Sequence, residues 1–141
     1  MLDPEVITKA TRRLRNKYDV VLLEGAGGLL VPITEQLLTL DYIAEQGYPV
    51  ILVTSGRLGS INHTLLSLEA IKSRDLEIHS VIYNHIHDNA AQTDEQIATS
   101  TIKFLQNYLA EHHPTAHWVA LPVQEDNGFS HTDFILPQNF V

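Results

Sequence analysis

Short apolar runs separated by stretches with helical spacing constrain the fold of this chain more than any other feature. The runs resemble strands buried on both faces, and they cover residues 19–24, 49–54, 78–84 and 118–121. Apolar residues recur at helical spacing over residues 4–16, 61–72 and 93–111, and a short helix is expected between the first two strands. Strands that alternate with helices favour a mostly parallel sheet with flanking helices, so the predicted fold class is α/β.

Length and charge exclude several classes of protein. A chain of 141 residues is long enough for one buried core, so residues 1–141 are expected to form a single α/β domain. Nine basic against 17 acidic residues, a net charge of -8, argue against binding to nucleic acid. No apolar run approaches the ~20 residues that a membrane helix needs. The first residues lack the pattern of an export signal, and there is no cysteine, so we expect a cytoplasmic protein.

A glycine-rich turn follows the first predicted strand. Glu24 stands at the strand end, and Gly25, Gly27 and Gly28 come directly after it. Glycine lets backbone N–H groups approach an anion closely, whereas Glu24 repels an anion unless a cation lies between them. Magnesium, which binds carboxylates together with phosphate oxygens, resolves that conflict. A purely structural turn explains the same residues equally well, and Leu30 at the sixth position of the motif argues against a dinucleotide site.

The ends of the other predicted strands also carry candidate binding residues. The second strand leads through Gly59 into a helix whose first residues include Ser60 and Asn62. The N–H groups at such a helix start attract a carboxylate or a phosphate, although Ser60 can equally be a helix cap. Asn84 and Pro122 follow the third and fourth strands, where they can border a nucleotide base or simply form turns.

The histidines and the serines suggest no further site. His85 and His87 alternate along the chain, and His112, His113 and His117 surround a proline, but neither group has a cysteine or a clear acidic ligand at metal-site spacing. A solvated surface is the favoured interpretation of both groups. No Gly-x-Ser-x-Gly motif is present, so serine hydrolysis is not indicated.

Two motifs in this order resemble the dethiobiotin synthase family. They are Val21-Leu-Leu-Glu-Gly-Ala-Gly-Gly-Leu-Leu-Val-Pro32 and Leu58-Gly-Ser-Ile-Asn-His-Thr64, and a weaker resemblance continues through residues 81–84 and 121–122. The resemblance implies a P-loop NTPase-like, three-layer α/β/α fold. It also implies an enzyme that uses ATP and Mg²⁺ to close a cyclic urea from 7,8-diaminopelargonate and CO₂ in biotin biosynthesis, and that works as a homodimer.

The resemblance also assigns roles to individual residues. Glu24 would be a magnesium ligand, and the substrate carboxylate would lie at the helix start contributed by the partner subunit. The implied ATP-binding residues are Glu24, Gly25, Ala26, Gly27, Asn84, Leu121, Pro122 and Val123. The implied substrate-binding residues are Gly27, Leu58, Gly59, Ser60, Ile61 and Asn62.

The sequence departs from the family pattern in one respect. The family has a Gly-x-x-x-x-Gly-Lys-Thr phosphate loop and a further catalytic lysine upstream of the glutamate motif, and this chain has no Gly-Lys pair. No catalytic residue is therefore assigned here. We expect a fold that is incomplete at its N-terminus, with an exposed sheet edge, and little or no activity of this chain alone. Two alternatives stay open: a non-catalytic truncated paralogue that acts as a dimerising binding or regulatory module, and a P-loop relative of the amidotransferase or ParA type.

Overall fold

The computed structural model describes residues 2–85 and 95–123. The chain divides between Tyr48 and Pro49 into two compact units, and each is described by itself. Within the described residues, no helix has both the length and the apolar character needed to cross a bilayer.

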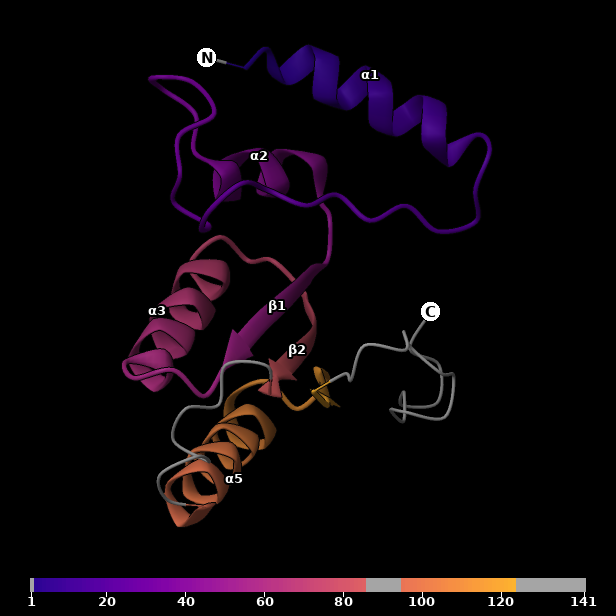
Figure 1. Ribbon diagram of the computed structural model, residues 1–141. Helices are drawn as coiled ribbons and strands as arrows, with labels where there is room; N and C mark the ends of the chain where they lie inside the picture. Colours follow the sequence, from indigo (N-terminus) through magenta and orange to yellow (C-terminus); the bar gives the residue numbers. More distant parts are fainter. Residues whose placement is uncertain (1, 86–94, 124–141) are drawn as a thin grey trace. The chain divides into compact units, whose positions relative to one another are not determined.

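The first unit is built from two helices. Helix α1 spans Pro4–Arg15 and α2 spans Thr39–Gln46 (Figure 1). The hydroxyls of Thr8 and Tyr42, 2.9 Å apart, join the two helices. Tyr42 is 2% exposed, so this hydrogen bond is made at the centre of the unit, where an unpaired hydroxyl would be costly.

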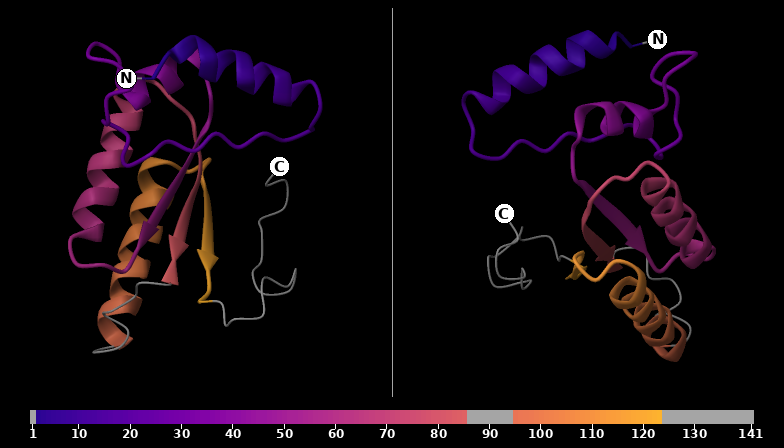
Figure 2. Two further views of the ribbon diagram at one scale, coloured as in Figure 1. Left: turned by 45° about the horizontal axis from the view of Figure 1, so that its top comes forward. Right: turned by 180° about the vertical axis from the view of Figure 1, so that it is seen from behind.

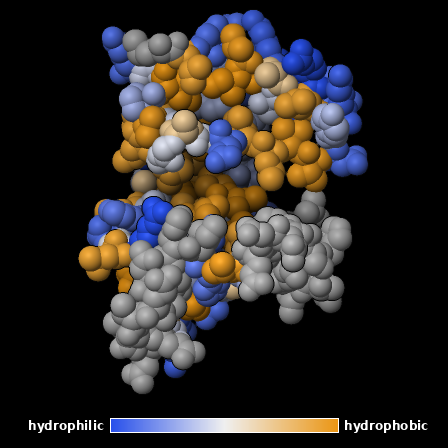
Figure 3. Space-filling view, in the orientation of Figure 1, coloured by the Kyte–Doolittle hydropathy of each residue, from blue (hydrophilic) through white to orange (hydrophobic). Residues whose placement is uncertain are grey.

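The strand predicted over residues 19–24 is not present. Those residues form an irregular connection after α1, and Figure 3 shows apolar residues gathered along it. Val20, Leu22 and Leu23 are 52%, 77% and 46% exposed. A strand is stabilised by pairing its N–H and C=O groups with a neighbour, and no described segment pairs with this one. Residues 19–24 therefore have the apolar pattern of a strand, but no strand among the described residues pairs with them.

The second unit contains a parallel sheet and two helices. Its elements follow one another as β1 (Val50–Ser55), α3 (Ser60–Lys72), β2 (Ile78–Asn84), α5 (Glu95–His112) and β3 (His117–Leu121). The strand order is β1-β2-β3, and both pairings are parallel. Right-handed crossovers between successive neighbours place their helices on the same side of the sheet, as the views of α3 and α5 in Figure 2 show. The predicted α/β class is confirmed.

The core of this unit lies between the sheet and the two helices. Its buried residues are Val50, Leu68, Ile71, Ile78, Val81, Tyr83, Ala98, Leu105, Leu109 and Val119. β1 does not match the prediction of a strand buried on both faces, because Val53 at its centre is 59% exposed. Thr54, the next residue, faces α3 through its hydrogen bond to Thr64, so Val53 lies on the opposite face of the sheet, away from the two helices.

Candidate functional site

The sheet brings several of the predicted site residues to one edge. Ser55 at the end of β1 pairs in register with Asn84 at the end of β2, and Asn84 pairs with Leu121 at the end of β3. Pro122 and Val123 follow directly, and Val123 is 58% exposed. Ligands of parallel α/β proteins bind beyond the carboxyl ends of the strands, so these residues border the region where a ligand is expected.

The start of α3 opens at the same edge. Gly59 is its N-cap, in the left-handed conformation with φ 84°, and no side chain caps the helix. The alternative that Ser60 serves as the cap is therefore wrong. Its hydroxyl instead donates to the carbonyl oxygen of Ser55, which ties the start of α3 to the end of β1. A helix start without a side-chain cap keeps backbone donors for an anion.

Hydroxyl groups fix this helix against the strand. Thr54 Oγ1 lies 2.9 Å from Ser60 Oγ and 2.6 Å from Thr64 Oγ1. Thr54 and Thr64 are buried, at 9% and 4% exposure, so the hydrogen bond between them is shielded from water. The position of the loop at residues 56–59 is set by these contacts at both of its ends.

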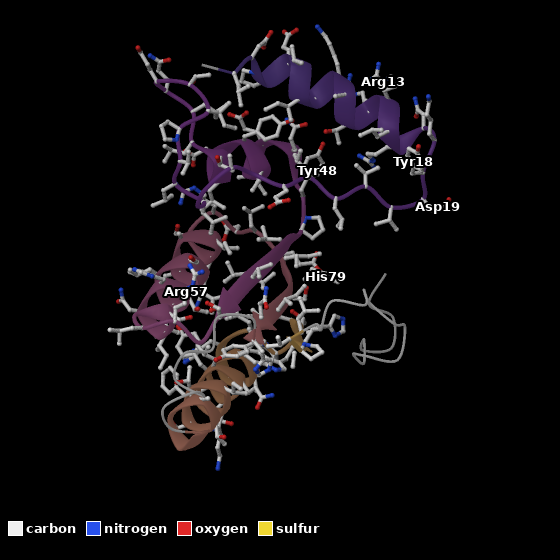
Figure 4. The ribbon with its side chains drawn as sticks, viewed as in Figure 1. Arg13, Tyr18, Asp19, Tyr48, Arg57 and His79 are labelled. Atoms are coloured by element: carbon white, nitrogen blue, oxygen red, sulfur yellow. The ribbon has the colours of Figure 1, made fainter. Side chains whose placement is uncertain are left out.

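A cavity of about 350 Å³ lies beside this loop, within the size range of small-ligand sites. It is lined by Leu52, Val53, Thr54, Ser55, Arg57, Leu58, Ser60, His63, Thr64 and Ser67. Figure 4 shows Arg57 at the loop between β1 and α3. Leu58 and Ser60 belong to the predicted set, whereas the contribution of Arg57 and the second turn of α3 was not foreseen. The spacing of Ser60, His63, Thr64 and Ser67, which places them on one helix face, is the signal that points to them.

The glycine turn belongs to the first unit. The turn folds back on the start of α2, because Leu40 N–H donates to Leu29 O at 2.8 Å and Thr39 N–H donates to Val31 O at 2.9 Å. Gly25 lies close to the start of α2, since a Cβ at this position would lie 3.1 Å from Thr39 Cγ2 and that methyl group would have to shift. Glu24 is exposed just before this fixed turn, so its carboxylate is accessible to a cation from solution.

The histidines form no metal site in the part of the chain that the structure describes. There, no group of three or more His, Cys, Asp or Glu side chains is placed to hold a metal ion. The rings of His79 and His117 meet edge to face at the start of β2 and β3, with centroids 5.5 Å apart. His113 departs from the predicted solvated surface, because its Nε2 is buried and has no hydrogen-bond partner. His87 lies outside the described residues.

The fold and the family comparison define the class of this protein. A parallel sheet, helical crossovers and a glycine-preceded helix start at the carboxyl edge are features of a P-loop NTPase-like α/β protein. A model of the AAA domain family matches residues 2–126, which is most of the chain.

Individual relatives narrow the class further. The chain is 50% identical over 121 residues to the ATP-dependent dethiobiotin synthetase BioD 2 of Haemophilus ducreyi, covering 86% of this chain and 56% of that protein. It is 50% identical over 113 residues to the protein of the same name from Pasteurella multocida, and the match covers 80% of this chain and 51% of that protein. It is 49% identical over 100 residues to the ATP-dependent dethiobiotin synthetase of Chlorobaculum tepidum, and the match covers 71% of this chain and 40% of that protein. The chain therefore belongs to the AAA domain family and to the family of dethiobiotin synthetases. It spans about half the length of these relatives.

Proposed function

We propose that this chain carries one part of the active site of an ATP- and Mg²⁺-dependent ligase, which forms the cyclic urea of dethiobiotin from 7,8-diaminopelargonate and CO₂. The observation that carries the proposal is the uncapped start of α3, which opens beside a cavity at the carboxyl edge of the sheet in a chain of this family. In this proposal the protein works as a homodimer in the cytoplasm.

The start of α3 is the proposed site for the carboxylate of the substrate. The segment from Leu58 to Asn62 includes the first turn of the helix, where the backbone donors and the helix dipole favour an anion. Asn62 is exposed, so its amide can add a hydrogen bond to a bound carboxylate. Gly59, Ser60 and Ile61 supply backbone around the same position.

The glycine turn and the strand ends are the proposed contacts of the nucleotide. Glu24 has the oxygen chemistry that Mg²⁺ prefers, and its exposure fits a ligand that completes its coordination with phosphate oxygens and water. Bound magnesium neutralises phosphate charge during phosphoryl transfer. Gly25, Ala26 and Gly27 would lie along the nucleotide and substrate. The adenine would be bordered by Asn84, Leu121, Pro122 and Val123.

Glu24→Gln tests the metal ligand. The substitution keeps the shape of the side chain but removes its charge, so the magnesium-dependent part of ATP binding should weaken at least ~10-fold. The measurement is calorimetric titration with ATP, with and without Mg²⁺. Glu35→Gln, an exposed glutamate in the same unit, is the matched control and should change nothing. Equal magnesium dependence in Glu24→Gln and the unmodified chain would exclude Glu24 as a ligand.

Asn62→Ala tests the carboxylate site. Loss of a hydrogen bond to a charged group costs about 1.5–3 kcal/mol, so the affinity for 7,8-diaminopelargonate should fall roughly tenfold or more while that for Mg-ATP is kept. Asn62→Asp should weaken the diamine acid further, because it places a like charge next to the substrate carboxylate. Equal losses for substrate and nucleotide would contradict a carboxylate site at this position.

A further inference from the structure

The cavity beside the loop at residues 56–59 differs in charge from the rest of the chain. Acidic residues outnumber basic ones by 17 to nine in the sequence, yet no aspartate or glutamate is among the described residues that line the cavity. Arg57 is the only permanently charged residue in that described lining. A cavity with a cation and without acidic side chains attracts anions and repels ammonium groups.

A tight turn holds the backbone of Arg57 in place. Ser60 N–H donates to the carbonyl oxygen of Arg57 at 2.9 Å, which closes a turn over residues 57–60. Gly59 has φ 84° and ψ -4°, the values of the third residue of a type II turn, where glycine is favoured. The Ser60 hydroxyl also ties the turn to Ser55 at the end of β1. The base of the Arg57 side chain is therefore fixed beside the cavity.

The guanidinium of Arg57 is available to a ligand. Arg57 is exposed, and its side chain makes no salt bridge or hydrogen bond with any residue that the structure describes. The backbone N–H groups of Ile61 and Asn62, close by in the first turn of α3, likewise have no partner among the described residues. A guanidinium presents its N–H donors in a planar fork that matches the two oxygens of a carboxylate. Backbone and side-chain donors at this place therefore suit the same anion.

We propose that Arg57 determines specificity for an ionised carboxylate, because its guanidinium pairs with the carboxylate that the N–H groups at the start of α3 bind. This inference rests on the proposed function and adds to it the side chain that distinguishes the acid from its neutral forms. Leu52 and Leu58 also line the cavity and suit the aliphatic chain of such an acid. The positive charge keeps the two amines of 7,8-diaminopelargonate away from this end of the cavity, so it also sets the direction in which the substrate binds.

The test compares 7,8-diaminopelargonate with its amide, in which an uncharged carboxamide replaces the carboxylate. Both compounds are titrated calorimetrically without nucleotide, so the result does not depend on turnover. We expect the unmodified chain to bind the acid at least ~10-fold more tightly than the amide. Arg57→Gln should reduce that preference about fivefold or more and leave the affinity for the amide unchanged. Arg57→Lys should recover part of the preference, because it keeps the charge but not the planar fork.

Lys103→Gln is the matched control. Lys103 is an exposed cation on α5 in the same unit and does not line the cavity, so the substitution removes the same net charge from a different place. This variant should keep the full preference for the acid. Raising the salt concentration from about 0.02 M to about 0.3 M should reduce the preference in the unmodified chain more than in Arg57→Gln, because salt screens the charge pair. Circular dichroism verifies that each variant is folded.

Three outcomes would overturn the proposal. If Arg57→Gln keeps the full preference for the acid, the backbone donors alone select it, and the carboxylate site of the proposed function stands without Arg57. Equal losses of affinity for the acid and the amide would show that Arg57 only supports the loop. If the unmodified chain binds neither compound, Arg57 selects nothing, and the proposed function is then judged separately by the Mg-ATP titration of Glu24→Gln.

Discussion

Gly27 is the residue in the glycine turn whose backbone most requires glycine. Its φ of 87° lies in the left-handed region, and a Cβ there would lie 3.0 Å from Val31 Cγ2. Gly28, its neighbour, has no atom within 4 Å of a built Cβ and no positive φ. The two positions therefore form a matched pair, alike in sequence and different in conformation.

Gly27→Ala should lower the free energy of unfolding by about 1–3 kcal/mol, the usual cost of a strained backbone conformation. Gly28→Ala should be neutral or slightly stabilising, because alanine restricts the unfolded chain. Urea denaturation of both variants measures the difference. Equal stabilities would contradict the turn geometry described above.

At the residue scale, the sequence identifies contiguous motifs and misses residues that meet only in the fold. Glu24 and the Leu58 to Asn62 segment stand out because glycines mark their turns. Arg57 and Ser67 were missed because their place at the cavity depends on α3 lying against β1. The cap at Gly59 could not be distinguished from one at Ser60, since either residue type is acceptable at that position.

The junction where α5 ends and leads into β3 contains a pH-sensitive group. Burial lowers the pKa of His113, and the positive charge of Lys72 and nearby His112 lower it further, against an opposing effect of Glu69. Tyr108 packs against both histidines and donates to Glu69 Oε1 at 3.2 Å. Burial and that hydrogen bond raise the pKa of Tyr108.

The free energy of unfolding should therefore fall as the solution is made acidic. The unfolded chain takes up a proton at His113 near the ordinary value of 6.5, while the folded chain resists it to lower pH. Stability from this residue is present above about pH 6.5 and is lost as the pH falls through the lowered pKa. His113→Leu should flatten the decline in urea-unfolding free energy between about pH 7.5 and about pH 5. An unchanged pH dependence in this variant would show that His113 does not titrate as described.

At the element scale, strands were predictable where a neighbour exists. The runs at β1, β2 and β3 each formed a strand, because parallel partners complete their hydrogen bonds. The run at residues 19–24 has the same pattern and formed none. Local sequence expresses the propensity for a strand, whereas pairing depends on a segment elsewhere in the polypeptide.

For the molecule as a whole, the α/β class and the family follow from sequence, because the order of strands, helices and glycine turns is a property of the entire chain. Among the described residues β1 is an outer strand that pairs only with β2, and the expectation of an incomplete fold stays a prediction. What sequence did not indicate is that residues of β1 and α3 line a common cavity. The chain spans about half the length of these relatives.

The most direct measurement is the formation of dethiobiotin from 7,8-diaminopelargonate, CO₂ and Mg-ATP. We expect no measurable product from the 141-residue chain alone, and product when it is combined with the part of the Haemophilus ducreyi relative outside the match. The Glu24→Gln variant should abolish that gain. Product formed by the 141-residue chain alone, or formed equally fast by the combined Glu24→Gln variant, would contradict the account.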